Sequence, residues 1–365
     1  MSACPACRRR AWLLGALNAR LEYSGRDPAR LAALLELPDE QLIRDVGGGE
    51  SESLLESYAG LRFERSEQLP TGTARICRHD ARYPNVLAGG AGAPRLLHVA
   101  GGLERLRRHL AAPSVAIVGA RGASDYGLEV AHGLARDLAA GGVTVLSGLA
   151  EGVAAAAHAG ALEAGGPTLT VAAGGIDVCH PASRQPLYAR LHSAGCVLAE
   201  LPCGVRPRSW CHTARARIVV ALARVVVVVE AGERPSELLH ARLAQGTDRI
   251  VAAVPGRVSA PLSRGTHALL REGAVLVRDP QDVRDVLGGA SVRTPASHRS
   301  PQPSPRDALA PPLRKLLDEV AGGRDTVAKL LAAGAPERET LNGLAHLELS
   351  GALVRGDAGR YVARL

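Results

Sequence analysis

The stretch VAIVGARG, residues 115–122, is a short apolar run that ends in glycines and an arginine. Apolar residues then recur at helical spacing from Leu128 to Leu138, and a second apolar run, VTVLSG, follows at 143–148. These periodicities predict a strand, a glycine-containing loop, a helix and a second strand, which together make one βαβ unit. The two strands are then parallel, and their carboxyl ends lie at the edge where open parallel sheets bind ligands.

The loop after the first of these strands is suited to an anion. Backbone N–H groups at the start of the next helix favour phosphate, and the guanidinium of Arg121 can grip a phosphate through two parallel hydrogen bonds. Gly119, Ser147 and Gly148 are small residues at the two strand ends, so their backbone can approach a ligand closely. The alternative for Arg121 is a surface charge or an internal salt bridge to Asp125 or Glu151.

Strands and helices alternate from residue 114 to about residue 287. Further strands are expected at 169–172, 196–198, 225–229, 249–253 and 275–277. The run of five valines at 225–229 is typical of a central parallel strand that is covered on both faces. The alternation predicts an α/β protein with a doubly wound parallel sheet. Residues 96–99 are expected to form an edge strand before it.

Three further segments flank this domain, which we place at 76–287. Residues 1–75 carry leucines at helical spacing and predict a small helical domain. Residues 288–311 are rich in proline and serine and predict a flexible linker. Residues 312–365 predict three helices and a β-hairpin, the pattern of a winged-helix domain. Its third helix, Pro336 to Leu349, is acidic, which favours contact with protein over contact with duplex DNA.

Composition limits the class of protein and of partner. The chain has 365 residues, a net charge of +8 and a pI of about 9.4, which suit an anionic partner. No apolar run approaches the ~20 residues of a membrane span, and the start of the chain does not resemble a signal peptide. Seven cysteines at scattered positions indicate a reducing cytoplasm.

Cys4 and Cys7 form a CxxC motif that could belong to a metal site. A structural zinc normally has four protein ligands, and no second pair with matching spacing is evident in the sequence. We therefore expect no metal, and cysteines that face solvent or have no redox role.

Enzyme classes with a recognisable sequence signature do not fit. The dinucleotide fingerprint G-x-G-x-x-G and its acidic partner are both missing, so no nicotinamide cofactor is expected. There is no G-x-S-x-G nucleophile motif. His158 is interpreted as a histidine that packs a helix, and Asp177 as a residue that forms a turn. We expect no catalytic residues and no cofactor.

Anion binding fits better, because arginines gather around the predicted loop ends. Single arginines are usually solvated, but several at one sheet edge can each neutralise a phosphate. The aromatic rings of Tyr126, His180, Trp210 and His212 lie near these arginines in the sequence and could stack on bases. Trp210 could equally cover the sheet edge. The candidate arginines for phosphate contacts are Arg121, Arg184, Arg215, Arg217 and Arg264.

Seven ordered motifs resemble those of the DNA-processing protein A (DprA/Smf) family. VAIVGAR at 115–121 resembles V-A-I-V-G-S/T-R, and SGLAEGVAAAAH at 147–158 resembles S-G-L-A-R-G-I-D-x-x-A-H. The remaining matches are GGID with a following His-Pro at 174–181, RARIV at 215–219, VVVEA at 227–231, AVPG at 253–256 and PLSRGTH at 261–267. The chain departs from the pattern at Ala182, where a basic residue is usual; Arg184 can replace it.

The resemblance implies a fold, a function and partners. The fold would be an extended Rossmann-like domain with a helical (SAM/HhH-like) N-terminal domain and a winged-helix C-terminal domain. The function would be to bind and protect single-stranded DNA in natural transformation, as a homodimer, and to load the RecA recombinase onto it. The resemblance also makes Arg121 the phosphate-binding arginine of the first loop. Two alternatives stay open: a nucleotide-5′-phosphate-binding or phosphoribohydrolase-type protein, and a protein-interaction module that no longer binds DNA.

Overall fold

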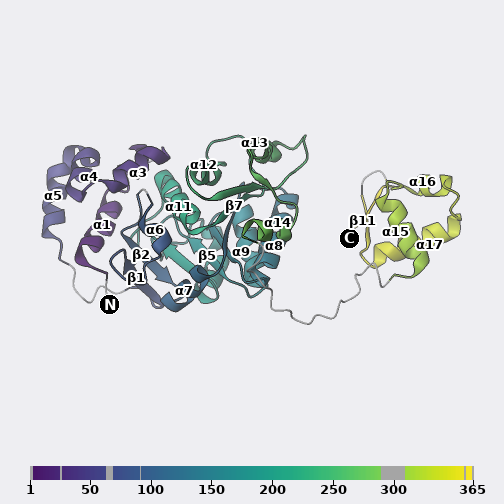
Figure 1. The fold of residues 1–365 in the computed structure, drawn as a ribbon, viewed down its shortest axis with the longest axis horizontal. Coiled ribbons are helices and arrows are strands. Elements are labelled where there is room, and N and C mark those ends of the chain that lie inside the picture. Colours follow the sequence, from purple (N-terminus) through teal and green to yellow (C-terminus); the bar gives the residue numbers. More distant parts are fainter. Residues whose placement is uncertain are drawn as a thin grey trace. The chain divides into compact units, whose positions relative to one another are not determined.

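The structure is a computed structural model that describes residues 3–24, 27–62, 69–90, 92–288, 309–356 and 359–363. The chain forms two compact units, Met1–Thr294 and Pro295–Leu365 (Figure 1). Most of the linker expected at 288–311 lies outside the described residues. In the part of the chain that is described, no helix combines the length and apolar character needed to cross a bilayer.

Nine described strands form one sheet in the first unit, in the order β1-β2-β6-β5-β4-β3-β7-β8-β9. They are β1 (Thr73–Cys77), β2 (Leu96–Ala100), β3 (Ser114–Val118), β4 (Thr144–Gly148), β5 (Thr168–Val171), β6 (Cys196–Ala199), β7 (Val225–Val228), β8 (Ile250–Ala253) and β9 (Val275–Leu276). The strands from β3 to β9 pair in parallel, while β2 runs antiparallel to both β6 and β1. The predicted α/β class and its parallel sheet are confirmed.

The strand order locates the ligand edge of the sheet. The strands β5-β4-β3-β7-β8-β9 follow the Rossmann order 3-2-1-4-5-6, and β6 extends the sheet beside β5. The order reverses between β3 and β7, whose residues pair from Val115↔Val225 to Val118↔Val228. Ligands of such sheets bind in the crevice at the carboxyl ends of these strands.

Two expectations about the start of the sheet are wrong. Residues 73–75 do not belong to a helical domain, because they begin strand β1. Leu96–Ala100 is not an edge strand, since β1 pairs on its free side and β6 on the other. All five residues of β2 are buried, as expected for an inner strand.

Helices cover both faces of the sheet, and each face has its own hydrophobic core. One core joins β3, β4 and β7 with apolar residues of α8 (Asp125–Ala140), α9 (Val153–Glu163) and α14 (Pro280–Val286). The other joins the opposite face with α7 (Leu103–Ala111), α11 (Ser209–Leu222), α12 (Leu239–Gln245) and α13 (Arg264–Arg271). The remaining helices around the sheet are α6 (Asn85–Ala88) and α10 (Gln185–Ser193), with short 3₁₀ turns at Ala182–Arg184 and Pro261–Ser263.

The N-terminal helices pack against helix α11 and belong to the same compact unit as the sheet. They are α1 (Pro5–Ala16), α2 (Leu21–Ser24), α3 (Pro28–Glu36), α4 (Asp39–Gly47) and α5 (Ser51–Gly60), with a 3₁₀ turn at Gly48–Glu50. Trp210 of α11 is fully buried in this contact, and its indole N–H donates to Asn18. The hypothesis that Trp210 stacks on bases is therefore wrong, because its ring is inaccessible.

The second unit has the expected three helices and hairpin. They are α15 (Pro311–Ala321), α16 (Val327–Ala332), α17 (Glu337–Leu349), β10 (Leu353–Arg355) and β11 (Tyr361–Ala363). Strands β10 and β11 pair antiparallel from Leu353↔Ala363 to Arg355↔Tyr361. Leu317, Leu344 and Leu347 are central to a separate small core, so this unit is held together by its own contacts.

The close crossing of α8 and α9 gives a test of this packing. A methyl group at Gly160 would lie 2.1 Å from the carbonyl oxygen of His132, whereas a methyl group at Gly133 would meet nothing within 4 Å. We predict that Gly160→Ala destabilises the protein by about 2 kcal/mol, because the helices must separate. Gly133→Ala should be neutral or stabilise by up to ~1 kcal/mol through helix propensity. Denaturant unfolding of both variants measures the difference, and equal effects would contradict the packing.

Candidate nucleic-acid interface

A cavity of about 790 Å³ opens at the carboxyl ends of β3 and β4, on one side of the point where the strand order reverses. It lies between the ends of these strands, the N-terminal half of α11 and the start of α12. The structure brings together five of the eight predicted binding residues at this cavity: Gly119, Arg121, Ser147, Gly148 and Arg215.

Arg215 is the most unusual group in the cavity wall. It is 9 % exposed, and its only side-chain hydrogen bond in the described structure goes to the carbonyl oxygen of Leu149, at 3.1 Å. Among the described residues, no carboxylate lies within ion-pair distance of its guanidinium. Burial, and secondarily the charge of Arg121, lower the pKa of Arg215 to about 10. The side chain remains a cation at neutral pH, so the cavity wall holds a buried positive charge without an ion-pair partner among the described residues. Glu22 and Glu237 also line the cavity, but they accept hydrogen bonds from the N–H groups of Ser209 and Gly232.

Gly148 creates the space for this guanidinium. A methyl group at position 148 would lie 2.5 Å from the Cζ atom of Arg215. The end of β4 therefore contacts the flat face of the guanidinium directly. The hydroxyl of Ser147, in contrast, donates to the carbonyl oxygen of Ile117 at 2.8 Å and so joins β4 to β3. Gly148 acts by its small size, and Ser147 acts through the strand pairing.

Arg121 lies at the rim of the cavity and is exposed. Neither Asp125 nor Glu151 forms an ion pair with it in the described structure, so the alternative of an internal salt bridge is wrong. The loop before it is held in place because Val153 at the start of α9 donates its N–H to the carbonyl oxygen of Ala120, at 3.2 Å. Gly152, at φ +70°, permits that close approach.

A second, shallower groove continues from Arg121 over helix α9. Arg121, Arg184 and Arg190 all line this groove, which has a volume of about 680 Å³. Arg184 is therefore separate from the cavity of Arg215 but connected to it through Arg121. Arg190 lies on α10 and is not suggested by any motif in the sequence. The three arginines outnumber the one carboxylate residue of the groove, Glu151, and form a basic path that leads away from the cavity.

His212 and His240 line the cavity in their neutral form. Burial, and secondarily the charge of Arg215, lower the pKa of His212 to about 4 and that of His240 to about 3. The ring centroids of His180 and His212 are 6.1 Å apart. The neutral rings of His212 and His240 add flat surfaces and hydrogen-bonding nitrogens to the cavity without adding charge.

The expectation that the start of α8 offers free N–H groups to a phosphate is wrong. The carboxylate of Glu230, which follows β7, occupies that position. It accepts hydrogen bonds from the N–H of Ser124 at 2.9 Å and from its hydroxyl at 2.6 Å. The Ser124 hydroxyl oxygen in turn accepts from the N–H of Gly127 at 3.2 Å. The protein thus supplies its own anion at the helix N-terminus, where Rossmann proteins bind phosphate.

Two predicted arginines line neither the cavity nor the groove. Arg217 is two positions after Arg215 on α11, and it forms a largely buried salt bridge with Glu200 at 2.5 Å. Its charge is therefore neutralised within the protein. Arg264 is exposed at the start of α13, in the segment that follows β8. It does not line the cavity or the groove.

His158 and Asp177, which the sequence could assign to a structural or a functional role, both have structural roles. His158 is completely buried, and its Nδ1 lies 2.8 Å from the hydroxyl oxygen of Thr168, which itself donates to the carbonyl oxygen of Val145. Nδ1 must therefore carry the proton, and His158 joins α9 to two strands, as predicted. Asp177 accepts two hydrogen bonds from the N–H of Gly204, at 2.8 and 3.0 Å, and so shapes a turn.

The CxxC motif lies outside this site and differs from expectation. Cys7 is buried and does not face solvent. Cys77 and His79, 70 or more positions later, come within reach of Cys4 and Cys7. Cys77 and His79 thus supply a second pair of possible metal ligands beside the CxxC motif. The sequence alone does not show that the two pairs lie together.

Comparison with known proteins places the sheet domain in one family. The family model described as DNA recombination-mediator protein A matches residues 74–288. The protein Smf of Escherichia coli (strain K12) is 34% identical over 273 residues, which are 74% of this chain and 72% of that protein.

Similar solved structures include two DNA processing proteins. The DNA processing protein A (DprA) of Streptococcus pneumoniae has a TM-score of 0.60 at 29% identity and covers 77% of this chain and 95% of its own. The DNA processing protein A of Helicobacter pylori has a TM-score of 0.53 at 27% identity and covers 59% of this chain and 95% of its own. The structure of the H. pylori protein concerns its single-stranded DNA binding mode.

The buried His158 predicts a dependence of stability on pH. Burial lowers its pKa from the ordinary 6.5 to about 4. As the pH falls, His158 therefore gains its proton in the unfolded state at a higher pH than in the folded state. Its contribution to stability is fully present above pH 6.5 and is lost as the pH falls toward 4. The loss from this residue alone should be on the order of 3 kcal/mol. In His158→Asn, an amide can still donate to Thr168 but does not titrate.

Unfolding of the parent and of His158→Asn should be measured between pH 7 and pH 4. The variant should start less stable at pH 7 but lose less stability on acidification, with a slope smaller by about one proton. The other buried histidines keep part of the slope in both proteins. Identical slopes would mean that His158 accepts a proton in the folded state without cost.

Proposed function

The chain belongs to the DNA recombination-mediator protein A family, and from this premise we propose that it binds single-stranded DNA through the cavity of Arg215 and the rim of Arg121. The support from the sequence is the match over 215 of 365 positions, counted from residues 74–288. The support from a relative is the H. pylori protein, whose structure concerns single-stranded DNA binding.

The observation that carries the proposal is the buried charge of Arg215. A guanidinium that is 9 % exposed and has no carboxylate partner among the described residues lowers the stability of the empty protein. A phosphate in the cavity would neutralise this charge and accept two of its N–H groups at once. The cost in stability is then recovered when the ligand binds. Arg121 at the rim would hold the next phosphate or steer the strand inward.

A single strand fits this arrangement better than a duplex. The phosphate must enter a recess to reach Arg215, and a single strand can bend its backbone into the recess while a stiff duplex cannot. The groove with Arg184 and Arg190 would then bind the strand outside the cavity. Phosphate contacts carry no sequence information, so binding should be largely independent of sequence. The rings of His180 and His212 can stack on bases without selecting them.

The wider role rests on family membership. We include in the proposal that the protein acts in DNA processing during transformation without catalysing a reaction itself. We also include that it works as a homodimer in the cytoplasm, protects incoming DNA, and loads RecA onto the bound strand. The C-terminal unit, with Glu337 and Glu339 exposed at the start of α17, is then better suited to a protein than to duplex DNA.

A nucleotide is the alternative ligand, because one phosphate can also neutralise Arg215. The two ligands differ in extent, since a mononucleotide would occupy the cavity alone. A strand would also use Arg184 and Arg190 in the groove. Competition of nucleoside monophosphates against labelled oligo-dT therefore distinguishes them. Release of free base from the nucleotide would support the phosphoribohydrolase alternative.

Arg121 should make one phosphate contact. Arg121→Ala should weaken binding to all single-stranded sequences alike. The variant makes one phosphate contact fewer, so its binding releases fewer counterions from the DNA. The log–log dependence of affinity on salt should flatten by roughly 0.7. The measurement is a titration of poly-dT at several salt concentrations.

The matched control is Arg136→Ala, because Arg136 is exposed near the far end of α8 and pairs with Asp137. It should leave both affinity and slope unchanged. If Arg121→Ala retains the parent affinity and slope, the rim of the cavity does not contact DNA. If both variants flatten the slope equally, binding follows overall charge and not this site.

Arg215 and Arg217 should respond in opposite ways to the same substitution. Arg215→Met removes a buried, unpaired charge, so stability should stay within about 1 kcal/mol of the parent, while DNA affinity falls. Arg217→Met leaves the buried carboxylate of Glu200 without its partner and should cost about 3–5 kcal/mol. Thermal unfolding and poly-dT titration of both variants provide the two readouts. A large loss of stability in Arg215→Met with unchanged affinity would make Arg215 a structural residue.

A further inference from the structure

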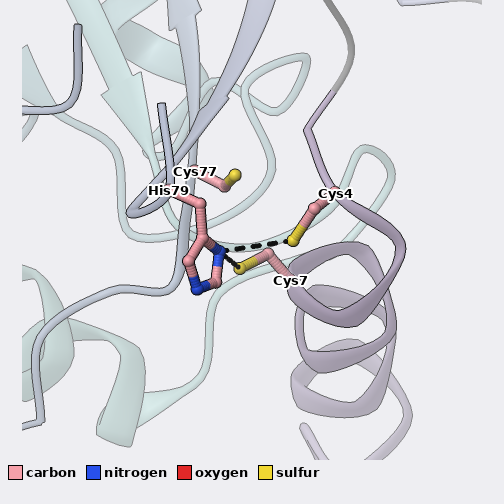
Figure 2. A group of neighbouring side chains, drawn as sticks. All are labelled: Cys4, Cys7, Cys77 and His79. Carbon is pink, nitrogen blue, oxygen red and sulfur yellow. Dashed lines mark hydrogen bonds between the residues drawn. The ribbon is translucent and has the colours of Figure 1, made fainter. Parts of the chain in front are cut away.

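Four side chains with metal-binding atoms converge at the edge of the sheet that lies farthest from β9. Cys4 and Cys7 come from the start of α1, Cys77 is the last residue of β1, and His79 is in the turn that follows (Figure 2). Their sulfur and nitrogen atoms all lie within 4.8 Å of one another. Four strands separate β1 from β3 in the sheet, so this cluster is distinct from the proposed DNA site.

The distances are those of a tetrahedral metal site. The Nδ1 atom of His79 lies 3.4 Å from the sulfur of Cys4 and 3.5 Å from the sulfur of Cys7. Around a tetrahedral zinc with ordinary bond lengths, a thiolate sulfur and an imidazole nitrogen are about 3.6 Å apart. The ligand atoms therefore need only small movements to surround an ion. Figure 2 shows the same nitrogen facing both sulfurs, with the thiol of Cys77 beside them.

The chain holds each pair of ligands in a form common to structural zinc sites. Cys4 is the N-cap of α1, and the N–H of Arg8 donates to its carbonyl oxygen at 3.1 Å, so Cys4 and Cys7 lie on the first turn of a helix. The positive end of the helix favours thiolates there. On the other side, the N–H of Asp80 donates to the carbonyl oxygen of Cys77 at 2.8 Å, which forms the turn that presents His79.

The composition of the cluster favours zinc over other ions. Thiolates and imidazole are soft or borderline ligands, and three sulfurs with one nitrogen are a common set in structural zinc sites. Four protein ligands leave no open position for a substrate. Cys7 and Cys77 are 1% and 3% exposed, which excludes water from that side of the site. The thiols of all three cysteines in the cluster are available, because none of the described cysteines forms a disulfide.

We propose that Cys4, Cys7, Cys77 and His79 bind one Zn²⁺ in a structural site that fixes helix α1 to the edge strand β1. The ligand pairs are separated by up to 75 positions in the sequence. An ion between them closes a long loop, and this closure favours the folded state. The ion also holds the N-terminal helices in place against the sheet.

The test uses the full chain purified under reducing conditions without added metal. Elemental analysis should find one zinc per chain. After the zinc is replaced by Co²⁺, the visible spectrum should show the intense bands of a tetrahedral ion together with a thiolate charge-transfer band. Removal of zinc by a strong chelator should lower the Tm, and equimolar Zn²⁺ should restore it.

Variants separate a metal site from an incidental cluster. His79→Ala should lose zinc, whereas His79→Cys keeps four soft ligands and should retain it. This pair does not depend on a buried residue, because His79 is exposed. Cys77→Ser should lose zinc, and Cys203→Ser, at a half-buried cysteine outside the cluster, should keep it.

Two results would overturn the proposal. One is a chain that contains no zinc and does not bind equimolar Zn²⁺ or Co²⁺ after reduction. The other is a disulfide between Cys4 and Cys7 in protein purified without reductant and alkylated before digestion, together with zinc content that is the same in His79→Ala and in the parent. That second result would indicate a redox pair instead of a metal site.

Discussion

The carboxylate of Glu230 fixes the ligand edge of the sheet. It follows β7 and caps the start of α8 through the N–H and hydroxyl of Ser124, while its own backbone carbonyl accepts from Ala120 at 2.7 Å. A methyl group at Gly119 would lie 2.6 Å from that carbonyl oxygen. The two strands on either side of the reversal are thus joined directly. The partial positive charge of the helix is satisfied inside the protein, so an incoming anion has no place there. The buried cation that such an anion can reach is Arg215 of α11, which contacts the end of β4, one strand further along, while Arg121 lies at the rim of the same cavity.

The elements that the sequence predicts well are those whose burial is uniform. β7 is apolar at every position and β3 nearly so. Such runs predict a parallel strand that is covered on both faces. β1 is harder, because the first three residues of Thr73–Cys77 are only partly buried and the strand is held by one antiparallel partner at the sheet edge. β2 can be recognised as a strand, but its neighbours cannot, since pairing with β6 joins segments about 100 positions apart. Register between distant segments is a tertiary property that no local pattern contains.

In the candidate site, too, some features follow from the local sequence and others depend on tertiary contacts. Arg215 and Arg217 are equivalent in the sequence, but two positions on a helix differ by about 200° in direction, so the two side chains point to different surroundings. Arg215 contacts Gly148 at the end of β4, and Arg217 forms a salt bridge with Glu200. Trp210 is similar: its ring is adjacent to the arginines in sequence, yet the N-terminal helices cover it. The position of Arg121 is predictable, because a loop that follows a strand directly has little freedom to move away from the sheet edge.

The contact between Gly148 and Arg215 restricts how this protein can change over evolutionary time. Any side chain at position 148 would displace the guanidinium, since even a single methyl group would lie 2.5 Å from its Cζ atom. A glycine at 148 without the arginine would leave a gap at the end of β4, and the arginine without the glycine would lose its place. Neither position can be substituted alone without loss, so the two residues should be inherited as a pair. Descendants that abandon this way of binding phosphate would then replace both residues, first at 215 and afterwards at 148, because only that order avoids a steric clash at the intermediate stage.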